Sequence, residues 1–159
     1  MPGNGTNFEA PLLVGTRPQS SPTTPQINDY GSAVLSQQVQ LAVATGTGAV
    51  TGTCYLPIGS AILDILVDTT TVWNSGTSDT LSVGSAAAGT QYASGVDVKT
   101  STGRVRPTFT AAQLAALQNI AAPAELFMTV TQVGTAATTG ATTVTVIYAP
   151  TVQLYVGNT

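Results

Sequence analysis

The amino-acid sequence predicts an all-β protein: a single jelly-roll or related β-sandwich domain, with an extended N-terminal arm and one short helix. Short runs in which apolar and polar residues alternate recur from residue 34 onward, separated by Gly, Ser, Asn or Pro. This pattern is typical of half-buried strands joined by turns. No sequence period of about 20–50 residues repeats, which disfavours solenoids and propellers. With 159 residues, the chain is long enough for one domain that buries roughly 68% of its unfolded surface.

The first strand is expected in residues 34–43, where Val39, Leu41 and Val43 alternate with polar or small residues. Further strands are expected at residues 49–56, 61–72, 80–84, 95–99, 105–109, 126–134, 142–148 and 151–156. The runs MTVTQVG and TTVTVIYA are expected to form an antiparallel hairpin across the small-residue segment 135–141. Short strands of this kind favour a sandwich or barrel over a parallel sheet.

Residues 61–72 predict a central strand, because both faces of the strand are partly apolar. One face would carry Leu63, Ile65 and Val67, and the other would carry Ile62, Asp64, Leu66 and Asp68. We expect the two aspartates to lie toward an end of the sheet or at an interface.

Residues 110–120 carry the helical pattern. Thr110 and Gln113 have the spacing of a capping box, and Pro123 is expected to stop the helix. The apolar stripe of the helix would consist of Leu114, Leu117 and Ile120. A helix this short would cover an open end of the sheets.

Residues 1–31 predict an extended arm in front of a β domain at residues 32–159. The arm contains five prolines, which hold the chain out of helices, so it would become ordered mainly on a partner surface. A disordered tail is the alternative. The apolar anchors of the arm, and hence its candidate contact residues, are Phe8, Leu12, Leu13 and Val14.

The composition predicts surfaces that other chains cover. Charged residues make up 7% of the chain, against about 25% in an average soluble domain, and the net charge is −3. Few charges leave a protein surface with little protection against association. Four basic residues cannot neutralise a row of phosphates, so nucleic-acid binding is not expected. The sequence shows neither an apolar run of about 18 residues nor a secretory signal, so no membrane partner is expected.

The sequence predicts no catalytic, cofactor or metal site. The chain contains no His, which excludes Ser-His-Asp and Cys-His sites. Asp64 and Asp68 would lie roughly 13 Å apart along one strand, too far for a glycosidase pair. A calcium site near Asn74, Ser75 and Asp79 is the weaker alternative to a polar turn, because no regular ligand spacing appears there. Cys54 is expected to be a buried, inert thiol.

Two surface features have alternative interpretations. Arg104 and Arg106 alternate on one expected strand, with Lys99 nearby. They form either a docking patch for an acidic partner or a solvated strand edge protected by charge, and we favour the patch. Four aromatic residues either plug the core or an interface, which we favour, or form a sugar-binding platform. These residues are Trp73, Tyr92, Tyr148 and Tyr155.

Two segments resemble the capsid decoration (cement) proteins of tailed bacteriophages. In LPIGSAILDILVDTTTVWNSGTSDTLSVG, residues 56–84, a turn leads into a strand rich in Val, Asp and Thr, and an aromatic-NSGTS turn leads to a strand ending LSVG. The segment FTAAQLAALQNIAAPAELFMTVTQVGTAATTGATTVTVIYAP, residues 109–150, is similar to the second half of these proteins. Together the segments cover a little under half of the chain.

The resemblance implies a virion structural protein, made in the bacterial cytoplasm, that sits on the capsid exterior and clamps major capsid subunits. It implies a homo-oligomer, with a homotrimer favoured and a homodimer possible. Clamping at many small contacts suits multivalent docking. Two other classes stay open: a head fibre or tail-associated domain that binds host carbohydrate, and a hydrolase of cell-surface glycan. The first requires exposed aromatics near loop tips, and the second requires two carboxylates within reach of each other.

Overall fold

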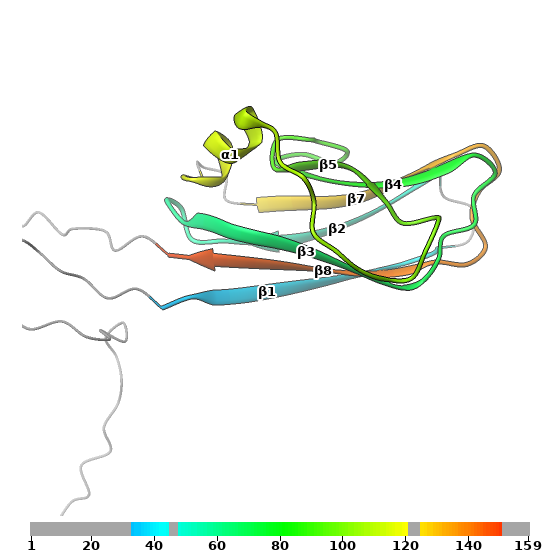
Figure 1. Ribbon diagram of the computed structural model, residues 1–159, viewed down its shortest axis with the longest axis horizontal. Helices are drawn as coiled ribbons and strands as arrows, with labels where there is room; N and C mark the ends of the chain where they lie inside the picture. Colours follow the sequence, from blue (N-terminus) through cyan, green and yellow to red (C-terminus); the bar gives the residue numbers. More distant parts are fainter. Residues whose placement is uncertain (1–32, 45–47, 121–124, 151–159) are drawn as a thin grey trace, which may run out of the picture. The chain divides into compact units, whose positions relative to one another are not determined.

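The computed structural model describes residues 33–44, 48–120 and 125–150, and these form a two-sheet β-sandwich with one helix (Figure 1). The predicted fold class is therefore confirmed. The expected arm and the expected strand at residues 151–156 lie outside the described residues. The elements are β1 (Leu35–Ala42), β2 (Ala49–Tyr55), β3 (Ala61–Thr71), β4 (Ser78–Gly84), β5 (Ala93–Asp97), β6 (Gly103–Val105), α1 (Ala111–Leu117), β7 (Glu125–Val133) and β8 (Ala141–Ala149).

The strand order is that of a jelly roll. Sheet A has the order β1-β8-β3-β6, and sheet B has the order β2-β7-β4-β5, with every pair antiparallel. The chain can be described as one long hairpin, in which the first four strands pair with the last four. The pairs are β1 with β8, β2 with β7, β3 with β6 and β4 with β5. Rolling this hairpin up produces two packed sheets and the additional pairs β3 with β8 and β4 with β7.

The expected hairpin of residues 126–134 and 142–148 is wrong. Strand β7 pairs with β2 and β4 in sheet B, whereas β8 pairs with β1 and β3 in sheet A. Both strands are nearly fully apolar on the face that points inward, so each must cover the core from opposite sides. The connection between them therefore crosses from one sheet to the other.

Strand β3 lies inside sheet A, between β8 and β6, as predicted for a central strand. Its expected faces need one correction. The pairing with β8 shifts register between Ile62 and Asp64, so that Leu63 is an extra residue. This bulge leaves Ile62 buried with Ile65, whereas Leu63 is half exposed. After the bulge, Asp64 and Asp68 point out of the sheet, away from the core.

The strand expected at residues 105–109 is displaced. Strand β6 spans Gly103–Val105 and ends two residues before Pro107. Proline has no backbone N–H for a ladder, and the residue before it is conformationally restricted, so Pro107 fits poorly inside the expected strand.

Helix α1 is confirmed, with the predicted capping box. The Thr110 side chain accepts from the backbone N–H of Gln113, and the Gln113 side chain accepts from the backbone N–H of Thr110. The expected apolar stripe is partly wrong, because Leu114 is exposed and Gln113 is buried with Leu117. Gln113 turns inward to donate to the Thr90 carbonyl at 3.0 Å.

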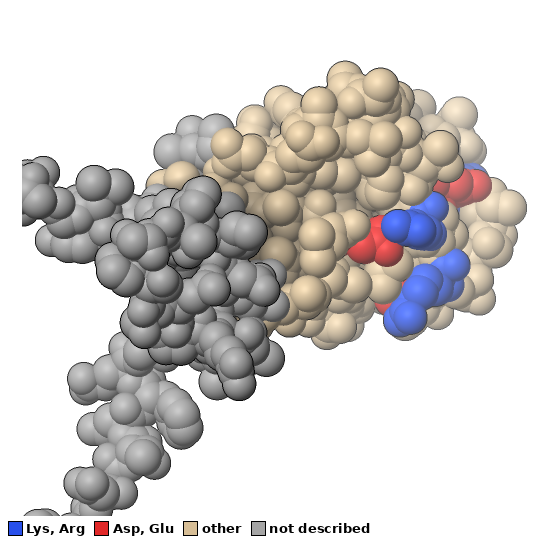
Figure 2. Space-filling model, turned by 60° about the vertical axis from the view of Figure 1, so that its left-hand side comes forward, with Lys and Arg blue, Asp and Glu red and all other residues tan. Residues whose placement is uncertain are grey.

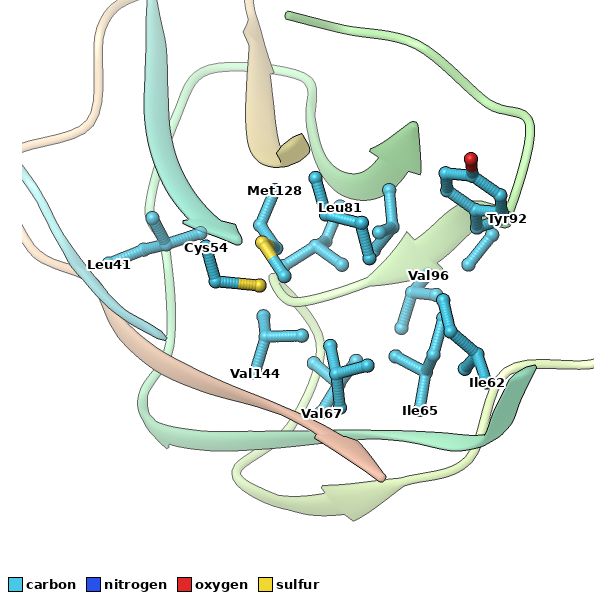
Figure 3. Packing of buried hydrophobic residues seen from close by; sticks show 14 of the residues in the cluster. Leu41, Cys54, Ile62, Ile65, Val67, Leu81, Tyr92, Val96, Met128 and Val144 are labelled. Atoms are coloured by element: carbon cyan, nitrogen blue, oxygen red, sulfur yellow. The ribbon is translucent and has the colours of Figure 1, made fainter. Parts of the chain in front are cut away.

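The core lies between the two sheets (Figure 3). Ile65 and Val67 of β3 and Val144 of β8 face Leu81 of β4 and Met128 of β7, and all five are fully buried. Each such side chain stabilises the folded state by roughly 1.5–3 kcal/mol relative to exposure. Alternate residues of the strands other than β6 thus form one apolar layer, whereas all three residues of β6 are exposed.

Candidate assembly surface

The outer face of sheet A carries two ion pairs between β3 and the segment that contains β6. Arg104 forms a two-pronged contact with Asp68, with Nε to Oδ1 at 2.8 Å and an Nη nitrogen to Oδ2 at 3.0 Å. Arg106 Nε donates to Asp64 Oδ1 at 2.9 Å. The hydrogen bond and charge of Asp68 raise the pKa of Arg104 further. Figure 2 shows basic and acidic side chains gathered in one region of the visible face.

These pairs change the interpretation of the predicted basic patch. Both arginine side chains are about two-thirds exposed, at 65% and 66%, so a partner could reach them. Each guanidinium already has a carboxylate, however, so the region is close to neutral. Surface pairs of this kind typically stabilise a fold little and protect a strand edge from further pairing.

The third basic residue that the structure describes, Lys99, contacts buried groups of the same chain rather than solvent alone. Its ammonium donates to the Ser75 carbonyl and lies 4.0 Å from Asp79 Oδ2. The Asp79 side chain is fully buried and accepts from the Ser75 backbone N–H at 3.0 Å. The residues of the weaker calcium alternative are therefore used in internal contacts, since Asn74 also accepts from the Thr138 backbone. Among the described residues, no cluster of three His, Cys, Asp or Glu could hold a metal ion.

Several segments that carry exposed apolar residues meet at one end of the sandwich, on the left in Figure 1. At this end β1 begins, β2 ends, β3 begins and β8 ends, and α1 lies beside them. Gln37 of β1 donates to the Tyr55 carbonyl at 2.6 Å, which ties the two edge strands together there. We call this region the apolar end. Its large hydrophobic residues, between 44% and 66% exposed, are Val34, Leu35, Tyr55, Ile58, Leu63 and Leu114.

The apolar end could not be predicted from the sequence, because its residues come from five separate segments. Leu63 is exposed only because of the bulge, and Leu114 only because Gln113 takes the inward position. The sequence signal that was present is the lack of charge: no charged residue lies between Asp29 and Asp64. The first charge beside this region is Glu125, which accepts from the Tyr55 hydroxyl at 2.9 Å. That hydrogen bond raises the pKa of Tyr55.

The sugar-binding platform, the less favoured alternative for the aromatic residues, does not form from those that the structure describes. Trp73, Tyr92 and Tyr148 are at most 8% exposed, so they are core residues, as the favoured interpretation predicts. Tyr155 lies outside the described residues. A surface groove of about 380 Å³ between β5 and the segment after β6 is lined by residues 94–97, 100, 101 and 105–108, none of them aromatic.

Of the six predicted contact residues, only Arg104 and Arg106 are described. Phe8, Leu12, Leu13 and Val14 lie outside the described residues, so their expected role stays a prediction. Cys54 is buried, as predicted, and burial raises the pKa of its thiol to about 11. In the part of the chain described, no helix is long and apolar enough to cross a membrane.

Comparison with known proteins supports the fold assignment. A scan against protein-family models and a search of curated proteins found no match. Among solved structures, the chain is similar to a chain in the capsid asymmetric unit of cyanophage Pam1. The TM-score is 0.53 and the sequence identity is 18%, over 87% of this chain and 100% of that chain. At this identity, the similarity shows a shared fold.

Proposed function

We propose that this protein is a structural component of a bacteriophage virion, which decorates the outside of the capsid and stabilises it by clamping major capsid subunits. The observation that carries the proposal is the apolar end: a jelly-roll domain that leaves six large hydrophobic side chains exposed on segments at one end of the sandwich. Concentrated apolar surface marks protein interaction sites. The shared fold with a chain of a phage capsid supports the same role.

We propose that the apolar end faces the major capsid protein. The described residues enter β1 and leave β8 at this end, so residues 1–32 and 151–159 both connect here. An arm that contacts the capsid would therefore continue directly from the docked end. Arg104 and Arg106 lie on the outer face of sheet A, where they would make a secondary, salt-sensitive contact.

The test is reconstitution on capsids that lack this protein. Purified full-length protein should bind such capsids to saturation and raise their thermal disruption temperature. The variant Ile58→Ser with Leu63→Ser should bind at least tenfold more weakly, because both side chains are half exposed and their loss leaves the core intact. The control is Val133→Ser. Val133 is 47% exposed and is the last residue of β7, at the end of the sandwich away from the apolar end. Saturated capsids of unchanged stability would contradict the clamping role.

The arm calls for a separate experiment. A chain beginning at Gly31 is expected to fold and to occupy fewer capsid sites than the full chain at equal concentration. An arm of 31 residues can span about 90 Å at roughly 3.1 Å per residue when extended, enough to reach a neighbouring subunit. Equal occupancy by the two chains would show that Phe8 and the cluster 12–14 do not contribute to attachment.

We also propose that the protein is not an enzyme. Asp64, Asp68 and Asp79 are each engaged with Arg or Lys, which leaves these carboxylates poorly placed for acid-base work. No hydrolysis of host glycan is expected. Turnover that disappears in Asp64→Asn or Asp68→Asn would overturn this proposal.

A further inference from the structure

We propose that β1 is the contact strand between two copies of this chain. The two β1 strands would pair antiparallel about a two-fold axis, so that sheet A continues across the dimer. This inference deepens the proposed assembly role, for which the resemblance favours a trimer, and it replaces the trimer with a dimer. It rests on the edge strands of the sandwich rather than on the apolar end.

Strand β1 is an unguarded edge. It pairs with β8 on one side, and no described strand pairs with its other side. Its eight residues, LSQQVQLA, contain no charge, proline or glycine, and they pair with β8 without a register shift. Natural proteins usually protect such an edge with charges, prolines, bulges or short strands, because its free backbone groups attract another strand. The absence of all four protections indicates that a strand covers β1 in the assembled protein.

The edges on the other side of the sandwich are protected. Strand β6 has three residues, carries the charge of Arg104 and is followed by Pro107. Strand β5 has five residues, contains Gly95 at φ +68° and pairs with β4 through a register shift. The protein therefore guards one side of the sandwich and leaves the β1 side open.

A second copy fits this edge because a two-fold contact places each residue opposite itself or a near neighbour. A charged edge would repel its own copy, but no charged residue lies between Asp29 and Asp64. The outward-facing residues Gln38 and Gln40 are exposed, and amide side chains can donate and accept at once. Gln38 already donates from its amide nitrogen to Thr145 Oγ1 at 3.2 Å, which leaves its carbonyl oxygen to accept. In the register centred on Val39, Gln38 lies opposite Gln40 of the second copy, whose amide nitrogen would donate to that oxygen.

The edge is also held in place before any partner arrives. Val39 and Leu41 point inward and pack on the backbone of Gly52 in β2. A Cβ atom at Gly52 would lie 2.5 Å from Val39 and 2.8 Å from Leu41. The Gln37 side chain adds the hydrogen bond to the Tyr55 carbonyl. A strand fixed in this way loses little conformational freedom on pairing, which favours association.

The first test measures the mass of the full-length protein by sedimentation equilibrium. We expect a dimer at micromolar concentration. The variant Gln38→Lys with Gln40→Lys should shift the protein toward monomer and raise the dissociation constant of the dimer at least tenfold. The reason is that four ammonium groups would meet at the two-fold axis. The control Ser101→Lys with Thr102→Lys adds the same charge at exposed positions beside β6 and should remain a dimer. A monomeric wild type, or a dimer unaffected by lysine at positions 38 and 40, overturns the proposal.

The second test identifies the strand by cross-linking. The variants Gln38→Cys and Gln40→Cys, each with one cysteine added to the native Cys54, are oxidised separately and as a mixture. A self-linked dimer of Gln38→Cys indicates a register centred on residue 38, and a link formed in the mixture indicates one centred on Val39. Opposed residues in antiparallel strands lie about 4.5–5.5 Å apart, within disulfide reach. Buried Cys54 serves as the internal negative control. No link in any of the three samples, with Ser101→Cys equally unlinked, overturns the contact.

Hydrogen exchange tests whether a segment of the same chain, rather than a second copy, covers the β1 edge. In a monomer, slow exchange of the β1 amides that point away from β8 would show that another segment of the same chain covers the edge, and would overturn the proposal. Capsid binding and solution mass are separate readouts. A dimer that does not bind capsids contradicts the proposed function and leaves the β1 contact standing, whereas a monomer that binds capsids contradicts the β1 contact alone.

Discussion

Gly140 lies directly against the indole ring of Trp73. A Cβ atom at Gly140 would be 2.4 Å from Trp73 Cδ2, closer than any side-chain atom can approach. The indole is 1% exposed and donates Nε1–H to Thr142 Oγ1 at 2.9 Å. The glycine therefore lets the β7–β8 connection close over the ring, and the ring anchors that connection to the end of β3.

The substitution Gly140→Ala should destabilise the fold by about 1–3 kcal/mol, because the added methyl group must displace a fully packed ring. Urea unfolding followed by Trp fluorescence measures both the loss of stability and any change around the indole. The control is Gly48→Ala, since a Cβ atom at Gly48 meets nothing within 4 Å. Equal stability of the two variants would show that the connection moves aside freely.

The sequence was sufficient to predict whether each segment forms a strand or a helix. It was insufficient to predict which strands pair with each other. Alternation located the strands from residues 34–43 to 142–148, and capping-box spacing located α1, because both depend on local geometry. Strand pairing depends on which faces must cover the same core. The segments with the most similar patterns, β7 and β8, are adjacent in sequence, yet they belong to opposite sheets.

The surface was harder to predict for the same reason. Periodicity places Leu63 on the face of Ile65 and places Ile62 on the opposite face. One extra residue at the bulge instead buries Ile62 with Ile65 and leaves Leu63 half exposed. Thr129 points out of sheet B by alternation, yet it is 1% exposed, because the loop after β4 folds over it and the Ala88 N–H donates to its hydroxyl at 3.0 Å. Such coverings involve residues far apart in sequence, and no local pattern reveals them.

The substitution Lys99→Met should destabilise the protein by about 1–3 kcal/mol. It removes the cation beside the fully buried Asp79 carboxylate and the hydrogen bond to the Ser75 carbonyl. The double variant Asp79→Asn with Lys99→Met should recover part of the loss, since the neutral amide needs no counter-charge. Unfolding free energies of the two single variants and the double variant give the coupling. Additive losses would mean that the two groups do not interact across their 4.0 Å separation.

The substitution Arg104→Ala should leave the urea midpoint unchanged within experimental scatter. Its pair with Asp68 is largely solvated, and such pairs are weakened by screening and by the side-chain entropy lost on pairing. Unfolding at low and at high salt should give the same ranking of wild type and variant. A clear loss of stability that disappears in 1 M salt would assign the pair a structural role at the β6 edge instead.

The thiol of Cys54 should react with Ellman's reagent at pH 8 only after unfolding. Burial raises its pKa from the ordinary 9.0 to about 11, so the folded protein holds the thiol protonated and out of reach. A raised folded-state pKa contributes stability that is fully present below pH 9 and is lost as the pH rises toward 11. Cys54→Ala should therefore show a shallower alkaline loss of stability than wild type, with the part due to Tyr92, whose pKa is also raised by burial, remaining. Fast labelling of the native protein at pH 8 would mean that the β1 and β2 edges open over Cys54, and would count against a rigid pairing edge as well.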